Sequence, residues 1–145
     1  PAVTDIVLLD DSLSEAAFLA EAAAVEMGSE HPLAAAVLER ARQQGLEIPA
    51  AADFAAIAGR GLRASVAGHA YVAGNRAFLE EEGLFAAQTQ AETTLQSLAQ
   101  VGKTPLLFAR DGRLVGIIAV ADTIRDSSRD AIRRFTEMGL QVDRR

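Results

Sequence analysis

The chain has 145 residues, a length that fits one globular domain, since single domains run about 100–200 residues. Half of the residues are hydrophobic and 23% are charged, and the absence of cysteine excludes disulfides, thiolate metal sites and thiol catalysis within this sequence. The net charge of −6 combines −8 over residues 1–59 with +2 over residues 60–145, and it would repel a phosphate backbone. We therefore expect no nucleic-acid partner. The longest apolar run, Leu114–Ala121, is shorter than the ~20 residues of a membrane helix, so we expect no direct membrane contact.

The first third of the chain predicts a strand followed by two helices. Val3–Leu9 has the apolar, β-branched composition of a strand. Ser12, with Glu15 three residues later, has the pattern of a capping box, which predicts a helix over Leu13–Met27. A second helix is predicted over Pro32–Gln44, because proline favours the first helical turn.

The middle of the chain changes to short alternating segments. Three strands are predicted, over Phe54–Ala58, Leu62–Ala67 and Ala70–Gly74, with Gly68-His69 as a two-residue turn. Asn75 should cap a short helix that ends near Glu82, and a longer helix should follow over Phe85–Gln100.

The last third predicts one clear hairpin and one more helix. Asp111-Gly112 separates strands over Leu106–Ala109 and Arg113–Val120, a typical signal for a tight hairpin. Asp126 should cap a final helix over Ser127–Met138. Strands and helices interspersed with hairpins indicate an α+β or mixed α/β fold.

Two glycine motifs match nucleotide-binding patterns without the required context. Gly59–Ala64 fits a loose G-x-G-x-x-G/A pattern, but the alternation that follows predicts a strand where a dinucleotide site needs a helix. Gly102-Lys103-Thr104 resembles the end of a Walker A loop, but Pro105 would obstruct the helix that must follow. The run Glu80–Glu82 is interpreted as a solvated helix end.

The break between the first two helices carries the best candidates for a site. Glu26 lies beside it, and His31 is held extended by the following proline. A position on such a linker would leave both side chains free of core packing. From spacing alone, the pattern favours an ordinary, partly exposed loop histidine over a site residue.

Ser29-Glu30-His31-Pro32-Leu33 resembles the S-E-H-P-L signature of the nucleotide-binding (N) domain of heavy-metal-transporting P-type ATPases, most closely the copper-pumping branch. Four more segments resemble that family in order and spacing: Gly59–Leu62, Tyr71–Arg76, Gly102–Thr104 with Gly116–Asp122, and the opening Pro1–Asp5. The resemblance implies an α+β fold in which helical hairpins flank an antiparallel sheet. It also implies that residues 1–118 form the N domain and residues 119–145 a fragment of the phosphorylation domain.

The resemblance implies roles for individual residues. Glu26 would accept a hydrogen bond from the adenine amino group of ATP, and His31 would stack on the base or bond it. Gly59, Gly61 and Leu62 would lie along the nucleotide. Gly74 and Asn75 would lie near the ribose and phosphates. Base selection by a carboxylate has a physical reason, since guanine presents a carbonyl where adenine presents its amino group.

The resemblance also implies what this chain lacks. No aspartate in it is followed by Lys-Thr-Gly, so we expect neither a catalytic nucleophile nor a metal ligand here, and Mg²⁺ would be needed by the parent enzyme instead. Asp122 and Arg125 match a family pair. The partners would be ATP or ADP and the phosphorylation and actuator domains of the same polypeptide. The location would be the cytoplasmic side of a bacterial inner membrane.

Two alternatives remain open from the sequence. A zinc- or cadmium-type pump would differ from a copper pump only in its cargo. A ligand-free α+β interaction module would use His31 and the glycines merely as turn residues.

Overall fold

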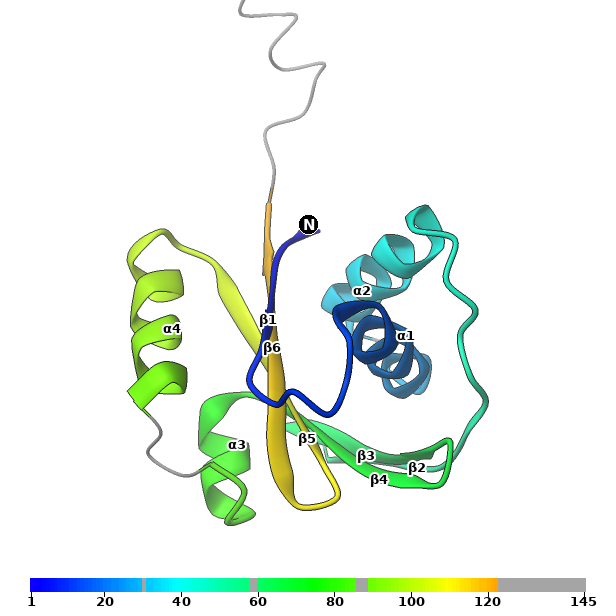
Figure 1. The fold of residues 1–145 in the computed structure, drawn as a ribbon. Coiled ribbons are helices and arrows are strands. Elements are labelled where there is room, and N and C mark those ends of the chain that lie inside the picture. The colour runs from blue at the N-terminus through cyan, green and yellow to red at the C-terminus, as the bar shows by residue number, and fades with distance from the viewer. Residues whose placement is uncertain (30, 58–59, 86–88, 123–145) are drawn as a thin grey trace, which may run out of the picture.

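The computed structural model describes residues 1–29, 31–57, 60–85 and 89–122, and its six strands form an antiparallel sheet in the order β1-β6-β5-β4-β3-β2. The strands are β1 (Ala2–Leu8), β2 (Ala51–Ile57), β3 (Gly61–Val66), β4 (His69–Gly74), β5 (Thr104–Arg110) and β6 (Arg113–Ala121). The helices are α1 (Glu15–Glu26), α2 (Pro32–Gln43), α3 (Arg76–Glu81) and α4 (Thr89–Gln100). In Figure 1, α1 and α2 lie on one side of the sheet and α3 and α4 on the other. This arrangement confirms the predicted α+β fold class.

The sheet separates two hydrophobic cores, because successive residues of a strand point to opposite faces. On β6, the buried Ile118 packs in the core with α1 and α2, whereas the adjacent Ile117 packs with α3 and α4. Phe18 of α1 meets Phe108 of β5 edge to face, with ring centroids 5.6 Å apart. A fully buried side chain of this size contributes about 1.5–3 kcal/mol, so these contacts fix the helices on the sheet.

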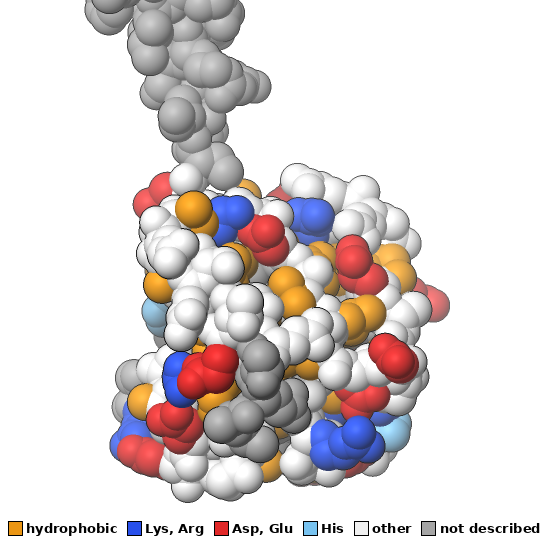
Figure 2. Space-filling model, turned by 60° about the vertical axis from the view of Figure 1, so that its left-hand side comes forward, with side chains coloured by type: hydrophobic (Ala, Val, Ile, Leu, Met, Phe, Trp, Pro, Cys, Tyr) orange, Lys and Arg blue, Asp and Glu red, His pale blue; other side chains and the backbone are white. Residues whose placement is uncertain are grey.

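Basic side chains from the C-terminal half pair with acidic side chains from the N-terminal half. Lys103 lies 2.6 Å from Asp5, Arg110 lies 3.1 Å from Glu21, and Arg113 lies 3.6 Å from Asp10. In Figure 2, blue and red side chains accordingly lie beside one another over the visible face. Part of the negative charge of the N-terminal half is therefore compensated by basic side chains on and next to the hairpin of β5 and β6.

The N-cap of α1 and the turn between β3 and β4 each lie one or two residues away from their predicted positions. The N-cap of α1 is Ser14, whose hydroxyl accepts a hydrogen bond from the amide of Ala17 at 3.1 Å, so the prediction of Ser12 was wrong. The amide of Ser12 instead donates to the Asp10 carboxylate at 2.9 Å. That turn holds Ser12 outside the helix and leaves Ser14 to begin it.

The β3–β4 turn is Ala67-Gly68, one residue before the predicted Gly68-His69. Both residues have positive φ, 51° and 83°, which the tight turn with matching strand twist requires. The predicted Asp111-Gly112 turn is confirmed, with φ values of 53° and 83°. Asn75 caps α3 as predicted, since its side-chain oxygen accepts from the Phe78 amide at 2.8 Å.

The ends of the described chain lie side by side at β1 and β6. The Pro1 amino group lies 3.4 Å from the Asp122 carboxylate. The predicted domain boundary between residues 118 and 119 falls inside β6, which pairs with β1 up to Ala121. The helix predicted over 127–138 and the residue at 125 lie outside the described residues, so the division at 118 stays a prediction. None of the helices in the described part of the chain is long and apolar enough to cross a membrane.

Candidate functional site

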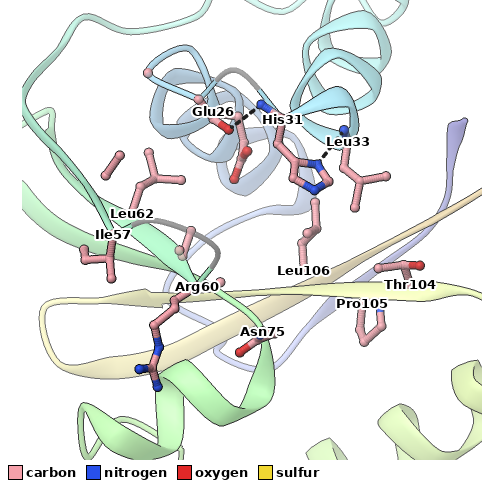
Figure 3. A pocket seen from close by; sticks show the side chains of 16 residues that line it. Glu26, His31, Leu33, Ile57, Arg60, Leu62, Asn75, Thr104, Pro105 and Leu106 are labelled. Atoms are coloured by element: carbon pink, nitrogen blue, oxygen red, sulfur yellow. Dashed lines mark hydrogen bonds between the residues drawn. The ribbon is translucent and has the colours of Figure 1, made fainter.

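A cavity of about 520 Å³ lies between the α1–α2 connection and the sheet. Its volume is in the range of small-molecule sites, about 300–1,000 Å³. Figure 3 shows Glu26, His31 and Leu33 on the helical side of the cavity, facing strand and loop residues on the other side. The cavity is lined by six of the seven predicted site residues: Glu26, His31, Gly61, Leu62, Gly74 and Asn75. The seventh, Gly59, lies outside the described residues.

Glu26 is the last residue of α1, and only 5% of it is exposed. Its place beside the helix break predicted a side chain free of core packing, and that prediction was wrong. Burial raises the pKa of its carboxyl to about 7, and no hydrogen bond from the described residues offsets that effect. A carboxylate in this state is stabilised by a ligand that brings a hydrogen-bond donor.

His31 is the N-cap of α2, a role that the sequence reading did not include. Its backbone is extended before Pro32, its amide donates to the Ser29 hydroxyl at 3.1 Å, and its ring Nδ1 accepts from the Leu33 amide at 3.1 Å. A ring whose Nδ1 accepts in this way carries its proton on Nε2. The cap therefore fixes the orientation of the ring, which points into the cavity (Figure 3).

The glycines of the site have a packing reason for lacking a side chain. A Cβ at Gly61 would collide with the Ala73 carbonyl oxygen and with the Phe78 ring. A Cβ at Gly74 would lie 2.6 Å from the Arg60 carbonyl oxygen and 2.7 Å from the same ring. The close approach at these two positions is thus between β3, β4 and α3 themselves.

The wall opposite the helices includes Thr104, Pro105 and Leu106 at the start of β5. Sequence reasoning did not assign these residues to the site. They reach the site because β5 pairs with β4, which places Leu107 opposite Gly74, and no local sequence pattern signals that pairing. Together with Leu33, Ile57 and Leu62, they make much of the cavity wall apolar, as in most small-molecule sites.

Glu80, Glu81 and Glu82 are exposed at the C-terminal end of α3, as predicted for a solvated helix end, and each of them also pairs with an arginine. Arg60 pairs with Glu81, Arg63 pairs with Glu82, and Arg76 pairs with Glu80 at 2.9 Å. Within the described ranges, no group of three or more histidine, aspartate or glutamate side chains is placed to hold a metal ion. Among the described residues that line the cavity, the charged side chains are the Glu26 carboxyl and the Arg60 guanidinium.

The sequence is similar to a known protein family and to several characterised relatives. Residues 3–142 match the haloacid dehalogenase-like hydrolase family. Relatives include a probable copper-exporting P-type ATPase V of Mycobacterium tuberculosis, 44% identical over 83% of this chain and 16% of the relative, and a copper-exporting P-type ATPase of Bacillus subtilis, 41% identical over 83% of this chain and 15% of the relative. The chain thus spans less than a fifth of the length of these relatives.

Solved structures agree in fold. A zinc-transporting PIB-type ATPase in its E2.Pi state superposes with a TM-score of 0.78 and 32% identity, over 95% of this chain and 22% of that chain. The N-domain of a copper-transporting P-type ATPase superposes with a TM-score of 0.70 and 27% identity, over 83% of this chain and 100% of that chain. The sheet with its two helical layers is therefore the fold of a P-type ATPase N-domain, and the chain belongs to the haloacid dehalogenase-like hydrolase family.

Proposed function

We propose that this chain is the ATP-binding domain of a copper-transporting P-type ATPase. It would clamp the adenosine of ATP and present the γ-phosphate to an aspartate on the phosphorylation domain. The observation that carries the proposal is the convergence of Glu26 and His31 on one apolar cavity. The similarity to copper-exporting pumps supports the same assignment.

The geometry suits adenine in particular. The Glu26 carboxyl has no donor among the described residues, and the exocyclic amino group of adenine would supply one. The fixed ring of His31 would stack on the base or donate from Nε2, while Leu33, Leu62 and Leu106 cover its faces. Stacking of a base on an aromatic ring contributes about 1–3 kcal/mol.

This domain would bind and orient the nucleotide without breaking it. Phosphoryl transfer needs a nucleophile in line with the γ-phosphate and a metal ion across the phosphates. Mg²⁺ would supply that charge neutralisation in the parent enzyme, and the described residues offer no cluster of carboxylates to hold it. In the proposal, the aspartate and the metal ligands belong to the phosphorylation domain.

A zinc- or cadmium-type pump is the second candidate, because a zinc-transporting PIB-type ATPase superposes on 95% of this chain and a probable cadmium-transporting ATPase of Staphylococcus aureus is 30% identical over 97% of it. Copper pumps match the chain as extensively, since a probable copper-exporting P-type ATPase of Archaeoglobus fulgidus is 36% identical over 98% of it. Nucleotide binding would be the same in either pump, since only the cargo differs. Metal-dependent ATPase activity of the full-length protein separates the two.

Calorimetric titration with ATP, ADP and GTP tests the proposed function. A stacked base and a few polar contacts predict a Kd for ATP of roughly 0.1–1 mM, with ADP comparable and GTP weaker because its carbonyl would face Glu26. A hundredfold preference for ATP over ADP would contradict a clamp centred on the base. Absence of binding by every nucleotide would favour a ligand-free interaction module.

A further inference from the structure

The cavity has two unlike ends. Glu26 and His31 lie on the helical side, and in Figure 3 Asn75 and Arg60 lie on the opposite side, where the Arg60 side chain runs from the cavity wall toward α3. If adenine occupies the end at Glu26, the ribose and phosphates extend toward Arg60. This orientation depends on the proposed function, because it takes the ligand to be an adenine nucleotide.

Arg60 differs from every other described residue that lines the cavity, because it carries a permanent positive charge. The polyphosphate of ATP is strongly anionic, and the chain itself has a net charge of −6. A nucleotide with more phosphates would therefore be repelled more strongly unless a cation meets it. Arg60 is placed to provide that cation, since it immediately precedes Gly61 at the start of β3.

Arg60 is also held where it can change partners. Its guanidinium is paired with Glu81 of α3, and the two side chains are 42% and 56% exposed. An exposed pair of this kind is weak, whereas a guanidinium binds phosphate oxygens through two charge-assisted hydrogen bonds. Phosphate can therefore displace the Glu81 carboxylate at little cost.

We propose that Arg60 binds the polyphosphate of ATP and ADP, and that Glu81 holds the guanidinium against α3 until the nucleotide arrives. Arg60 thus distinguishes ATP and ADP from AMP and adenosine, while Glu26 and His31 recognise the base. No bond is made or broken in this exchange of partners.

The chain offers a matched control. Arg63 lies three residues further along, is also 42% exposed, and pairs with Glu82, the residue that follows Glu81 and caps α3. Its guanidinium lies 5.8 Å from the centre of the Phe78 ring, and Arg63 is not among the residues that line the cavity. Replacing Arg63 removes the same charge three residues away without removing a proposed phosphate contact.

The experiment titrates ATP, ADP, AMP and adenosine into the wild-type chain and the variants Arg60→Gln, Arg63→Gln and Glu81→Gln, without Mg²⁺ and at fixed ionic strength. Arg60→Gln should weaken ATP and ADP about 5–10-fold and AMP and adenosine less than about twofold, because only the phosphate contact is lost. Arg63→Gln should change each affinity less than about twofold, and Glu81→Gln should strengthen ATP about 2–3-fold. Amide spectra of the variants verify the fold.

The outcomes separate the two proposals. If Arg60→Gln leaves ATP unchanged, or weakens adenosine as much as ATP, the assignment of Arg60 is overturned while adenosine binding by the wild type still supports the proposed function. An equal loss of ATP affinity in Arg63→Gln also overturns it, since general charge would then explain the effect. If no nucleotide binds the wild type, the proposed function fails, and the role of Arg60 fails with it.

Discussion

Replacing Glu26 by glutamine should stabilise the folded chain at neutral and alkaline pH. Burial raises the pKa of the Glu26 carboxyl from 4.5 to about 7. The folded state therefore binds more protons than the unfolded state between these values, and the free energy of unfolding falls as the pH rises through this window. The penalty is absent below pH 4.5 and complete above pH 7. Glutamine, which is neutral and of similar size, removes it.

The magnitude follows from the size of the shift. A change of one pKa unit corresponds to 1.36 kcal/mol, so the Glu26 penalty reaches about 3 kcal/mol above pH 7. This is an upper value, because exposed residues such as His31 line the same cavity and admit water to it. For a domain of this length, the full penalty would raise the Tm of Glu26→Gln by roughly 10 °C at pH 8.

The assay is urea unfolding of the wild type and Glu26→Gln from pH 4.5 to pH 8.5. The stability difference should grow from near zero at the acid end to its maximum above pH 7. Glu39→Gln is the control, since Glu39 is exposed on α2 and its ionic partner within the described ranges is the equally exposed Arg42, so its replacement should change stability little at any pH. Equal stability of Glu26→Gln and the wild type at pH 8, or a difference independent of pH, would refute the reasoning.

Three further substitutions or assays test other parts of the account. His31→Ala should lose about 0.5–2 kcal/mol through the missing N-cap and bind ATP several-fold more weakly, whereas His31→Asn should recover the stability but not the affinity; recovery of both would remove the ring from the site. Gly61→Ala should cost about 1–3 kcal/mol in urea unfolding, because its Cβ meets the Ala73 carbonyl, and unchanged stability would contradict that packing. The isolated chain with labelled ATP and Mg²⁺ should neither release phosphate above background nor form an acyl phosphate, and steady turnover abolished by His31→Ala would show that a catalytic group is present.

Elements with strong local signals were predictable from the sequence. Asp111-Gly112 forms the predicted turn because both residues adopt positive φ. Asn75 caps α3 because its side chain accepts from the amide of Phe78, only three residues away. The Ser14 cap and the Ala67-Gly68 turn differ from their predicted positions for equally local reasons. Asp10 competes for the Ser12 amide, and the β3–β4 turn uses Ala67 in a positive-φ conformation that residue preferences disfavour.

The site was predictable only in part. The resemblance named Glu26 and His31, and the structure places both on one cavity. The wall formed by Thr104, Pro105 and Leu106 depends on β5 lying between β4 and β6, a long-range pairing that local patterns do not encode. The burial of Glu26 and the pairing of Arg60 with Glu81 arise in the same way, from contacts between elements distant in sequence.

The central claim is that an adenine nucleotide binds between the α1–α2 connection and the sheet, with its base at Glu26 and His31. Titration of ATP into the isotope-labelled chain, followed by backbone amide shifts, tests it most directly. The account predicts saturable shifts at Gly28, Leu33, Leu62 and Leu106, which line the cavity, and none at the distant β3–β4 turn, Ala67-Gly68. Saturable shifts confined to residues away from the cavity, with Gly28 and Leu33 unmoved, would contradict it.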